Sequence, residues 1–393
     1  MFALAVLTVS GASFAQSSVT IGGLIDIAPL SMGKVTTMAK ESNTAVGVKT
    51  DRTGSPTTWA TSVLTVSGTE DLGGGLKANF LLMSGAGAGT GAHTPDSTTN
   101  ASDSGIGNRE RSVGLSGGFG ALRIGRFVPA AAAGFHAFTQ TGSATLVGSA
   151  YGMSTANSSA SANGLHTNSH NFERINNVVQ FTSPTMSGFT ANLAIANNGN
   201  DSDASAATGK ADSHQTSFHI GYAAGPLSAG FGVNTLKSNV EAAAGKDATS
   251  SAFAVAAVEA SSADSHLQWI GASYNLGVAT LGFANIHREG SATDDEGTKT
   301  TGTDINVNVF GVTVPMGALT LRASTYSGKD KRGTGASDNV KLSGNQISAV
   351  YALSKRTAIV LATGTNEYKR DGEASEAATR KAQATTLSVN HTF

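Results

Sequence analysis

The sequence predicts an all-β fold, a transmembrane antiparallel β-barrel of about 16 strands with long external loops and short periplasmic turns. Segments of about ten residues alternate apolar with polar side chains, as strands do when one face meets lipid and the other meets water. The connections between these segments are alternately long and short. Only 13% of the residues are charged, whereas a soluble domain carries about 25%.

Composition restricts the class of protein further. The chain has 393 residues, of which 39% are hydrophobic and 48 are glycine. No stretch approaches the ~20 consecutive apolar residues of a membrane-spanning helix, whereas a barrel needs only every second residue to be apolar. The absence of cysteine excludes disulfides and thiolate metal sites. A net charge of −1 argues against a nucleic-acid-binding surface.

The first fifteen residues have the pattern of a secretory signal peptide. An apolar core is followed by small residues at Ser13 and Ala15, so we expect cleavage before Gln16 and a barrel domain over residues 16–393. A basic region at the start is missing, which a truncated start would explain. The alternative reading is a short hydrophobic first strand.

The predicted strands follow one another through the whole mature chain. In the segment 227–234, for example, Leu227, Ala229, Phe231 and Val233 alternate with small or polar residues. The expected strands are residues 19–28, 58–68, 76–83, 109–116, 121–126, 174–182, 189–196, 214–222, 227–234, 265–274, 278–287, 303–313, 318–326, 345–352, 356–365 and 383–393. Every second connection is tight, and the long ones hold the charged clusters. A soluble β-sandwich or a β-solenoid adhesin also has many short strands, but neither is expected to alternate long and short loops so strictly.

One long connection stands out because it contains no Asp, Glu, Lys or Arg. It covers residues 127–172, with Arg123 and Arg126 before it and Arg174 after it. An irregular connection of this length is uncommon and is usually functional. We expect it to be a loop folded into the lumen of the barrel.

Several segments resemble the general porins of Gram-negative outer membranes, particularly those of betaproteobacteria. Residues 18–26 (SVTIGGLID) are similar to their first strand, and residues 68–78 (GTEDLGGGLKA) to their second hairpin. Residues 108–126 resemble their fourth and fifth strands, residues 174–189 their sixth and seventh, and residues 351–357 (YALSKRT) their fourteenth hairpin. The resemblance covers nearly the whole mature chain, and it rests on the order and spacing of these segments rather than on one motif.

The resemblance implies a homotrimer of sixteen-stranded barrels in the outer membrane, surrounded by lipid and lipopolysaccharide. Each barrel would hold a water-filled lumen, narrowed by the third external loop, for passive diffusion of small hydrophilic solutes and ions. Such porins commonly set acidic residues of that loop against a row of wall arginines. Residues 127–172 form the third external loop by strand count and carry no carboxylate. Weak anion preference is therefore expected.

The resemblance also implies the pore-lining residues. Arg109 and Arg174 match wall arginines of the family, and Arg111, Arg123 and Arg126 are their expected neighbours. Val63 stands where the family usually has another arginine.

Because the loop has no carboxylate, we expect Asp26 or Glu173 to supply the negative charge of the pore, if the pore has any. Asp304 and Glu110 are further candidates for side chains that face the lumen. The aromatic end of the last strand, Phe393, resembles the signal that the outer-membrane assembly machinery recognises in this family.

Two of these arginines are also placed by alternation. Arg123 lies between Leu122 and Ile124, so it faces inward if they face lipid. Arg111 has the parity of Val113, which places it outward, whereas the resemblance places it in the lumen. We adopt the lumen for Arg111; an arginine simply solvated at a strand end is the alternative for each.

No pattern for catalysis or metal binding emerges, so we expect no enzyme activity, cofactor or metal. His166 and His170 lie four residues apart but in a Ser/Asn-rich loop with no third ligand nearby. Asp201, Asp203 and the run 294–296 are read as solvated loop charges rather than as a Ca²⁺ site. An outer-membrane hydrolase and a β-rich adhesin without channel activity remain the alternatives.

Overall fold

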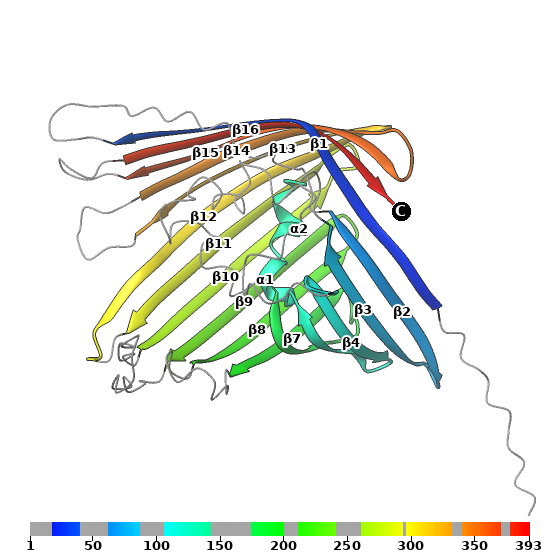
Figure 1. The fold of residues 1–393 in the computed structure, drawn as a ribbon. Coiled ribbons are helices and arrows are strands. Elements are labelled where there is room, and N and C mark those ends of the chain that lie inside the picture. Colours follow the sequence, from blue (N-terminus) through cyan, green and yellow to red (C-terminus); the bar gives the residue numbers. More distant parts are fainter. Residues whose placement is uncertain are drawn as a thin grey trace, which may run out of the picture.

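The computed structural model describes residues 18–39, 62–86, 106–142, 174–199, 211–240, 261–293, 296–331, 340–370 and 378–393. Within these ranges the chain forms sixteen antiparallel strands that close into one barrel, in which each strand pairs with its neighbours in sequence and β1 pairs with β16. The predicted fold class is therefore confirmed (Figure 1). None of the helices in these ranges is long and apolar enough to cross a membrane.

The strands differ in length around the barrel. The first seven are β1 Ser18–Ala39, β2 Val63–Gly73, β3 Leu76–Gly85, β4 Glu110–Gly117, β5 Gly120–Phe127, β6 Ile175–Thr182 and β7 Phe189–Gly199. The others are β8 Ala211–Ala224, β9 Leu227–Val240, β10 Ser261–Asn275, β11 Thr280–Thr293, β12 Lys299–Met316, β13 Leu319–Asp330, β14 Val340–Ala352, β15 Thr357–Arg370 and β16 Ala378–Thr392. Thus β4 to β6 have eight residues each, whereas β8 to β16 have 12 to 18.

Many of the longer strands extend beyond their predicted bounds toward the long connections. β14, for example, begins at Val340 instead of residue 345. The predicted bounds relied on apolar residues on one face, and the extensions carry polar residues on the outer face, such as Lys341 and Ser343.

Side-chain exposure separates the two faces of the wall. On the outer face, apolar residues are exposed, among them Ile270, Phe310, Ile347 and Leu361. On the inner face, the neighbouring positions of the same strands are buried, as Trp269 and Val309 are. Strand alternation thus places apolar side chains on the outer face, where lipid would contact them. It also leaves a cluster of apolar side chains on the inner face, against which the loop after β5 packs.

The chain end closes the barrel. The backbone N–H of Phe393 donates to the carbonyl of Gly23, and the N–H of Gly23 donates to the carbonyl of Phe393, both at 3.2 Å. Its ring lies against Gly23, where a Cβ atom would come within 2.5 Å of the ring carbon Cζ. A larger residue at position 23 would therefore displace the ring at the seam between β1 and β16.

Candidate pore and constriction

The start of the uncharged segment turns into the barrel. After β5 it forms two four-residue helices, α1 Ala130–Ala133 and α2 His136–Thr139, which lie within the ring of strands (Figure 1). The segment was predicted to lack regular structure, so these helices are a finding of the structure. Residues 143–173 lie outside the described ranges.

Aromatic packing fixes these helices to one side of the wall. α1 contacts β7, β8 and β9, and α2 contacts β10, β11 and β12. Phe135 and Phe138 are buried against Trp269 of β10, with ring centroids 6.4 Å and 5.8 Å away. The indole Nε1 of Trp269 donates to the carbonyl of Ala131 at 2.6 Å. A buried apolar contact and a buried hydrogen bond therefore hold the same turn.

Glycines of the wall allow the segment to approach closely. A Cβ atom on Gly282 of β11 would overlap the carbonyl oxygen of Phe138, and one on Gly311 of β12 would overlap that of Thr139. On β10, a Cβ atom on Gly271 would lie 2.5 Å from Cδ2 of Phe138. Only glycine leaves room for this backbone at these positions.

Polar bonds complete the attachment at both ends. The N–H of Ala130 donates to Gln180 Oε1 at 3.1 Å, and Gln346 Nε2 donates to the carbonyl of Thr141 at 3.1 Å. Between them, the hydroxyl of Thr313 donates to Gln140 Oε1 at 2.9 Å. The segment from Ala130 to Thr141 is thereby held by β6, β12 and β14 across the lumen.

Arg123 is the predicted pore arginine with the clearest lumen geometry. It pairs with Gly114 and Gln180, on the face opposite the exposed Val113 and Ile124. Its NH2 forms a 2.9 Å ion pair with Glu110 Oε2, its Nε donates to Ser112 Oγ at 2.9 Å, and its Cζ lies 4.1 Å from the ring centroid of Phe127. Glu110 thus adds a negative charge at the same place.

Arg111 and Arg126 are placed differently. The two arginines lie opposite each other in the β4–β5 pairing. Arg111 also lies opposite Leu82 of β3, on the same face of the wall as Val113 and its partner Phe80. The pairing of Arg111 therefore agrees with the alternation and not with the lumen placement that we adopted from the resemblance. Strand register decides this, because it fixes the face of every residue in an unbroken ladder.

Arg126 acts as a buried link between segments. It is 3% exposed. Its Nε donates to the carbonyl of Asn108 at 3.1 Å, and its NH1 donates to the carbonyl of Arg174 at 2.9 Å and to Asn176 Oδ1 at 3.0 Å. This residue joins the start of β4 to the start of β6 and, being buried, presents no open charge to a pore.

The remaining predicted residues lie at strand ends or at the seam. Arg109 directly precedes β4 and donates its N–H to the carbonyl of Met83 at 3.0 Å, and Arg174 directly precedes β6. Asp26 is fully buried on the inner face of β1, where its N–H donates to Ser62 Oγ at 2.9 Å. Glu173 lies outside the described residues.

Two inward arginines were missed in the sequence. Arg322 of β13 pairs with Thr313 and Ser348 and lies against Gly142, where a Cβ atom would come within 2.7 Å of NH1. Its alternation with Leu321 and Ala323 would have predicted an inward side chain. Arg288 of β11 is buried on the inner face, and it escaped notice because it lies one residue beyond the predicted strand.

Arg123 and Arg322 lie on opposite walls. β13 is the eighth strand on from β5 in a ring of sixteen, so the two strands are half-way round the barrel from each other. Each arginine follows three residues after the start of its strand. Positive side chains therefore enter the lumen from both sides of the ring.

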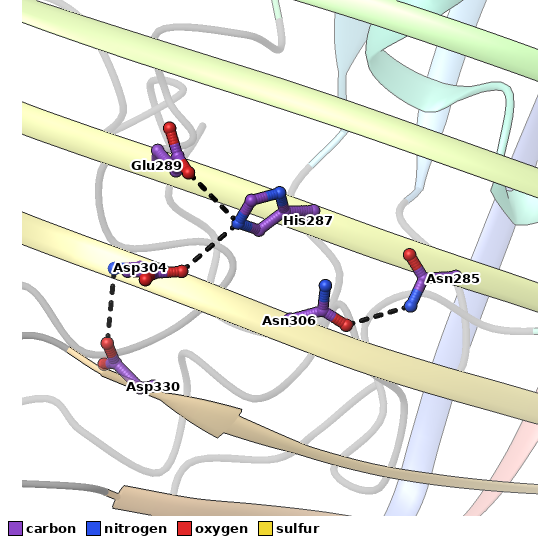
Figure 2. A network of polar contacts seen from close by, with 6 residues as sticks. All are labelled: Asn285, His287, Glu289, Asp304, Asn306 and Asp330. Carbon is purple, nitrogen blue, oxygen red and sulfur yellow. Dashed lines mark hydrogen bonds and ion pairs between the residues drawn. The ribbon is translucent and has the colours of Figure 1, made fainter.

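A polar cluster occupies the outer face of β11 and β12 (Figure 2). His287 Nε2 lies 3.2 Å from Asp304 Oδ1 and 3.4 Å from Glu289 Oε1, and Asn285 Nδ2 donates to Asn306 Oδ1 at 2.9 Å. The three titratable groups have donor types that a metal ion uses, and their ligand atoms lie within 4.8 Å of one another. His287 also bridges Glu289 and Asp304, which are directly paired across the two strands.

Comparison with known proteins agrees with this geometry. The model of the Gram-negative porin family matches residues 3–371. The chain belongs to the Gram-negative porin family. Outer membrane porin protein 32 of Delftia acidovorans is 31% identical over 369 residues, which cover 91% of this chain and 86% of that protein. The chain is therefore an outer-membrane channel.

Solved structures share the fold. An anion-selective porin from Comamonas acidovorans is 24% identical and aligns over 96% of this chain and 100% of its own, with a TM-score of 0.56. OmpT of Vibrio cholerae in its trimer form is 10% identical and aligns over 96% of this chain and 99% of its own, with a TM-score of 0.57.

Proposed function

We propose that this porin is a trimeric diffusion pore for small hydrophilic solutes and ions with a weak preference for anions. The observation that carries the proposal is the pair of inward arginines on opposite walls, Arg123 and Arg322, beside a loop segment without a carboxylate. A lumen lined by excess positive potential concentrates anions. The ion pair of Arg123 with Glu110 keeps the preference weak.

Similarity to other porins supports the same direction. One of the similar solved structures is named as anion-selective, and its fold is the fold of this chain. We also propose that Arg109 and Arg174 contribute to the wall potential, as the family resemblance implies. Arg174 directly precedes β6, and its backbone carbonyl accepts a hydrogen bond from Arg126.

Planar-bilayer recording tests the channel and its selectivity together. Correctly folded protein should insert with stepwise conductance, and reversal potentials in a salt gradient should shift toward the anion. Arg174→Ala should reduce that shift. A cation-directed reversal potential would contradict the charge assignment, and folded protein that conducts no current would favour the adhesin alternative.

We infer the trimer contact from the outer face of the short strands. An apolar hollow of about 550 Å³ lies over β1 to β5 and is lined by, among others, Val19, Phe80, Val113, Leu115 and Ile124. β4 and β5 have eight residues, slightly fewer than the ~9–11 that a strand needs to cross the hydrocarbon alone. A second copy would cover this sector, and one of the similar structures is described as a trimer.

The remaining outer wall would contact lipid and lipopolysaccharide, and Phe393 would carry the assembly signal. Phe393 is 44% exposed and pairs with Gly23 at the seam. Phe393→Ala should lower the yield of assembled barrels in cells while protein refolded in detergent still forms them. Equal yields in cells would remove the signal role.

A further inference from the structure

The polar cluster on the outer face of β11 and β12 brings three metal-ligating side chains together (Figure 2). His287 and Glu289 lie on the same face of β11, because they are separated by one residue. Asp304 of β12 is directly paired with Glu289. The three side chains point toward one another, and the imidazole Nε2 faces both carboxylates. Two strands thus offer one nitrogen and two oxygen ligands at the same place.

The negative charge of this cluster exceeds the charge that its histidine can supply. Two carboxylates directly opposite each other destabilise a pair of strands. Within the part of the chain that the structure describes, His287 is the only residue that forms an ion pair with Glu289 or Asp304. Lys331 lies beside Asp304, but there its backbone N–H donates to the backbone carbonyl at 2.8 Å. An imidazole carries one positive charge at most, whereas a divalent cation would offset both carboxylates.

The distances within the cluster fit a tetrahedral metal ion. With metal–ligand bonds of ~2.0–2.1 Å, neighbouring ligand atoms of a tetrahedron lie ~3.3 Å apart. His287 Nε2 is 3.2 Å from Asp304 Oδ1 and 3.4 Å from Glu289 Oε1, so two edges of such a tetrahedron are already formed. The two carboxylate oxygens lie within 4.8 Å of each other. Closing this third edge requires a shift of at most ~1.5 Å, which the exposed side chain of Glu289 can make.

The ligand types indicate which metal would bind. Ca²⁺ and Mg²⁺ take oxygen ligands, whereas an imidazole nitrogen suits Zn²⁺ and similar metals. A zinc site with three protein ligands keeps its fourth position for a water molecule. Glu289 is exposed and the other two side chains are partly exposed, so an ion and a water molecule can enter from outside the barrel.

We propose that His287, Glu289 and Asp304 bind a Zn²⁺ ion, with water as the fourth ligand. The ion would join β11 to β12 just before the register of the two strands shifts, between Gly290 and Ser291. It would therefore hold the hairpin where the hydrogen-bond ladder becomes irregular. No metal site was predicted from the sequence, because only the pairing of the two strands brings Asp304 to His287. The site is separate from the lumen and needs no channel activity.

Isothermal titration calorimetry with ZnCl2 tests the proposal. The samples are the full chain without a histidine tag, refolded in detergent and freed of metal with a chelator, as the wild type, His287→Gln and Asp304→Asn. We expect a site in the wild type whose affinity falls at least ~10-fold in either variant, because even residues that only support a metal ligand contribute that much. Asp304→Asn keeps the test available if His287→Gln does not fold.

His214→Gln is the matched control. His214 is an exposed histidine of β8 with Nε2 3.5 Å from Asp212 Oδ2, and the described part of the chain gives it that one carboxylate instead of two. This variant should bind Zn²⁺ like the wild type. Equal losses in His214→Gln and His287→Gln would overturn the proposal, because the binding would then be spread over surface histidines.

Two further results would overturn the proposal: an unchanged Zn²⁺ affinity in both site variants, or displacement of Zn²⁺ by an excess of CaCl2, which would indicate a site made of oxygen ligands alone. Hydrogen exchange tests the link between the strands. Zn²⁺ should slow amide exchange near residues 287–289 in the wild type but not in His287→Gln, and equal exchange with and without Zn²⁺ would refute the link. Loss of Zn²⁺ binding with wild-type conductance leaves the channel proposal intact.

Discussion

The indole Nε1 of Trp269 on β10 donates a 2.6 Å hydrogen bond to the carbonyl of Ala131, which lies 138 residues earlier in the chain. This bond joins the barrel wall to the segment that enters the lumen. Trp269 is buried, and its ring also contacts Phe135 and Phe138. The position of this segment therefore depends on one side chain of the wall as well as on the segment itself.

Trp269→Phe should loosen the constriction while keeping an aromatic ring. It leaves a buried carbonyl without its donor, which costs about 1–3 kcal/mol. We expect noisier single-channel currents than those of the wild type at the same voltage. Tyr274→Phe, an outward aromatic on the same strand, is the matched control and should leave the noise unchanged. If the currents of Trp269→Phe are as quiet as those of the wild type, the hydrogen bond does not hold the segment.

Gly282→Val should displace the turn that carries Phe138 and change the conductance. The added side chain takes the place of the Phe138 carbonyl oxygen, so the backbone must move away from the wall. We expect an altered single-channel conductance and a free energy of unfolding that is lower by about 1–3 kcal/mol. Ala323→Val adds similar volume on the outer face of β13 and should alter neither quantity. An unchanged conductance for Gly282→Val would contradict the close packing.

Charge changes on the two walls should shift selectivity in opposite directions. Glu110→Gln removes the partner charge of Arg123 and should strengthen the anion preference, whereas Arg322→Gln removes an inward positive charge and should weaken it. Reversal potentials in a salt gradient measure the selectivity of both variants. Their difference from the wild-type reversal potential should shrink at high salt, because salt screens the charges. Arg356→Gln in the turn after β14 serves as the control. Shifts of the same sign would refute the placement of these residues.

Leu115→Gln should weaken the trimer. It places a polar amide in the apolar hollow over β1 to β5, where we propose that a second copy packs. Leu361→Gln makes the same change on the outer face of β15 and should leave the subunits together. Native mass spectrometry in detergent counts the chains in each complex. Equal trimer fractions for the two variants would place the subunit contact elsewhere.

The sequence by itself determined the architecture. Sixteen alternating segments, joined by alternately long and short connections, predicted the number and order of strands, because a strand has a period of two residues and each face meets one solvent. The inward side of Arg123 followed from its apolar neighbours Leu122 and Ile124 by the same reasoning.

Only the tertiary structure decided what meets across the barrel. The pairing of Arg111 with Leu82 depends on the register between neighbouring strands, the burial of Arg126 on its hydrogen bonds to the carbonyls of Asn108 and Arg174, and the place of Arg322 opposite Arg123 on closure of the ring. The contact of Ala131 with Trp269 depends on how a loop folds back onto a closed ring. Local periodicity records which face a residue takes, but not which residue it faces there.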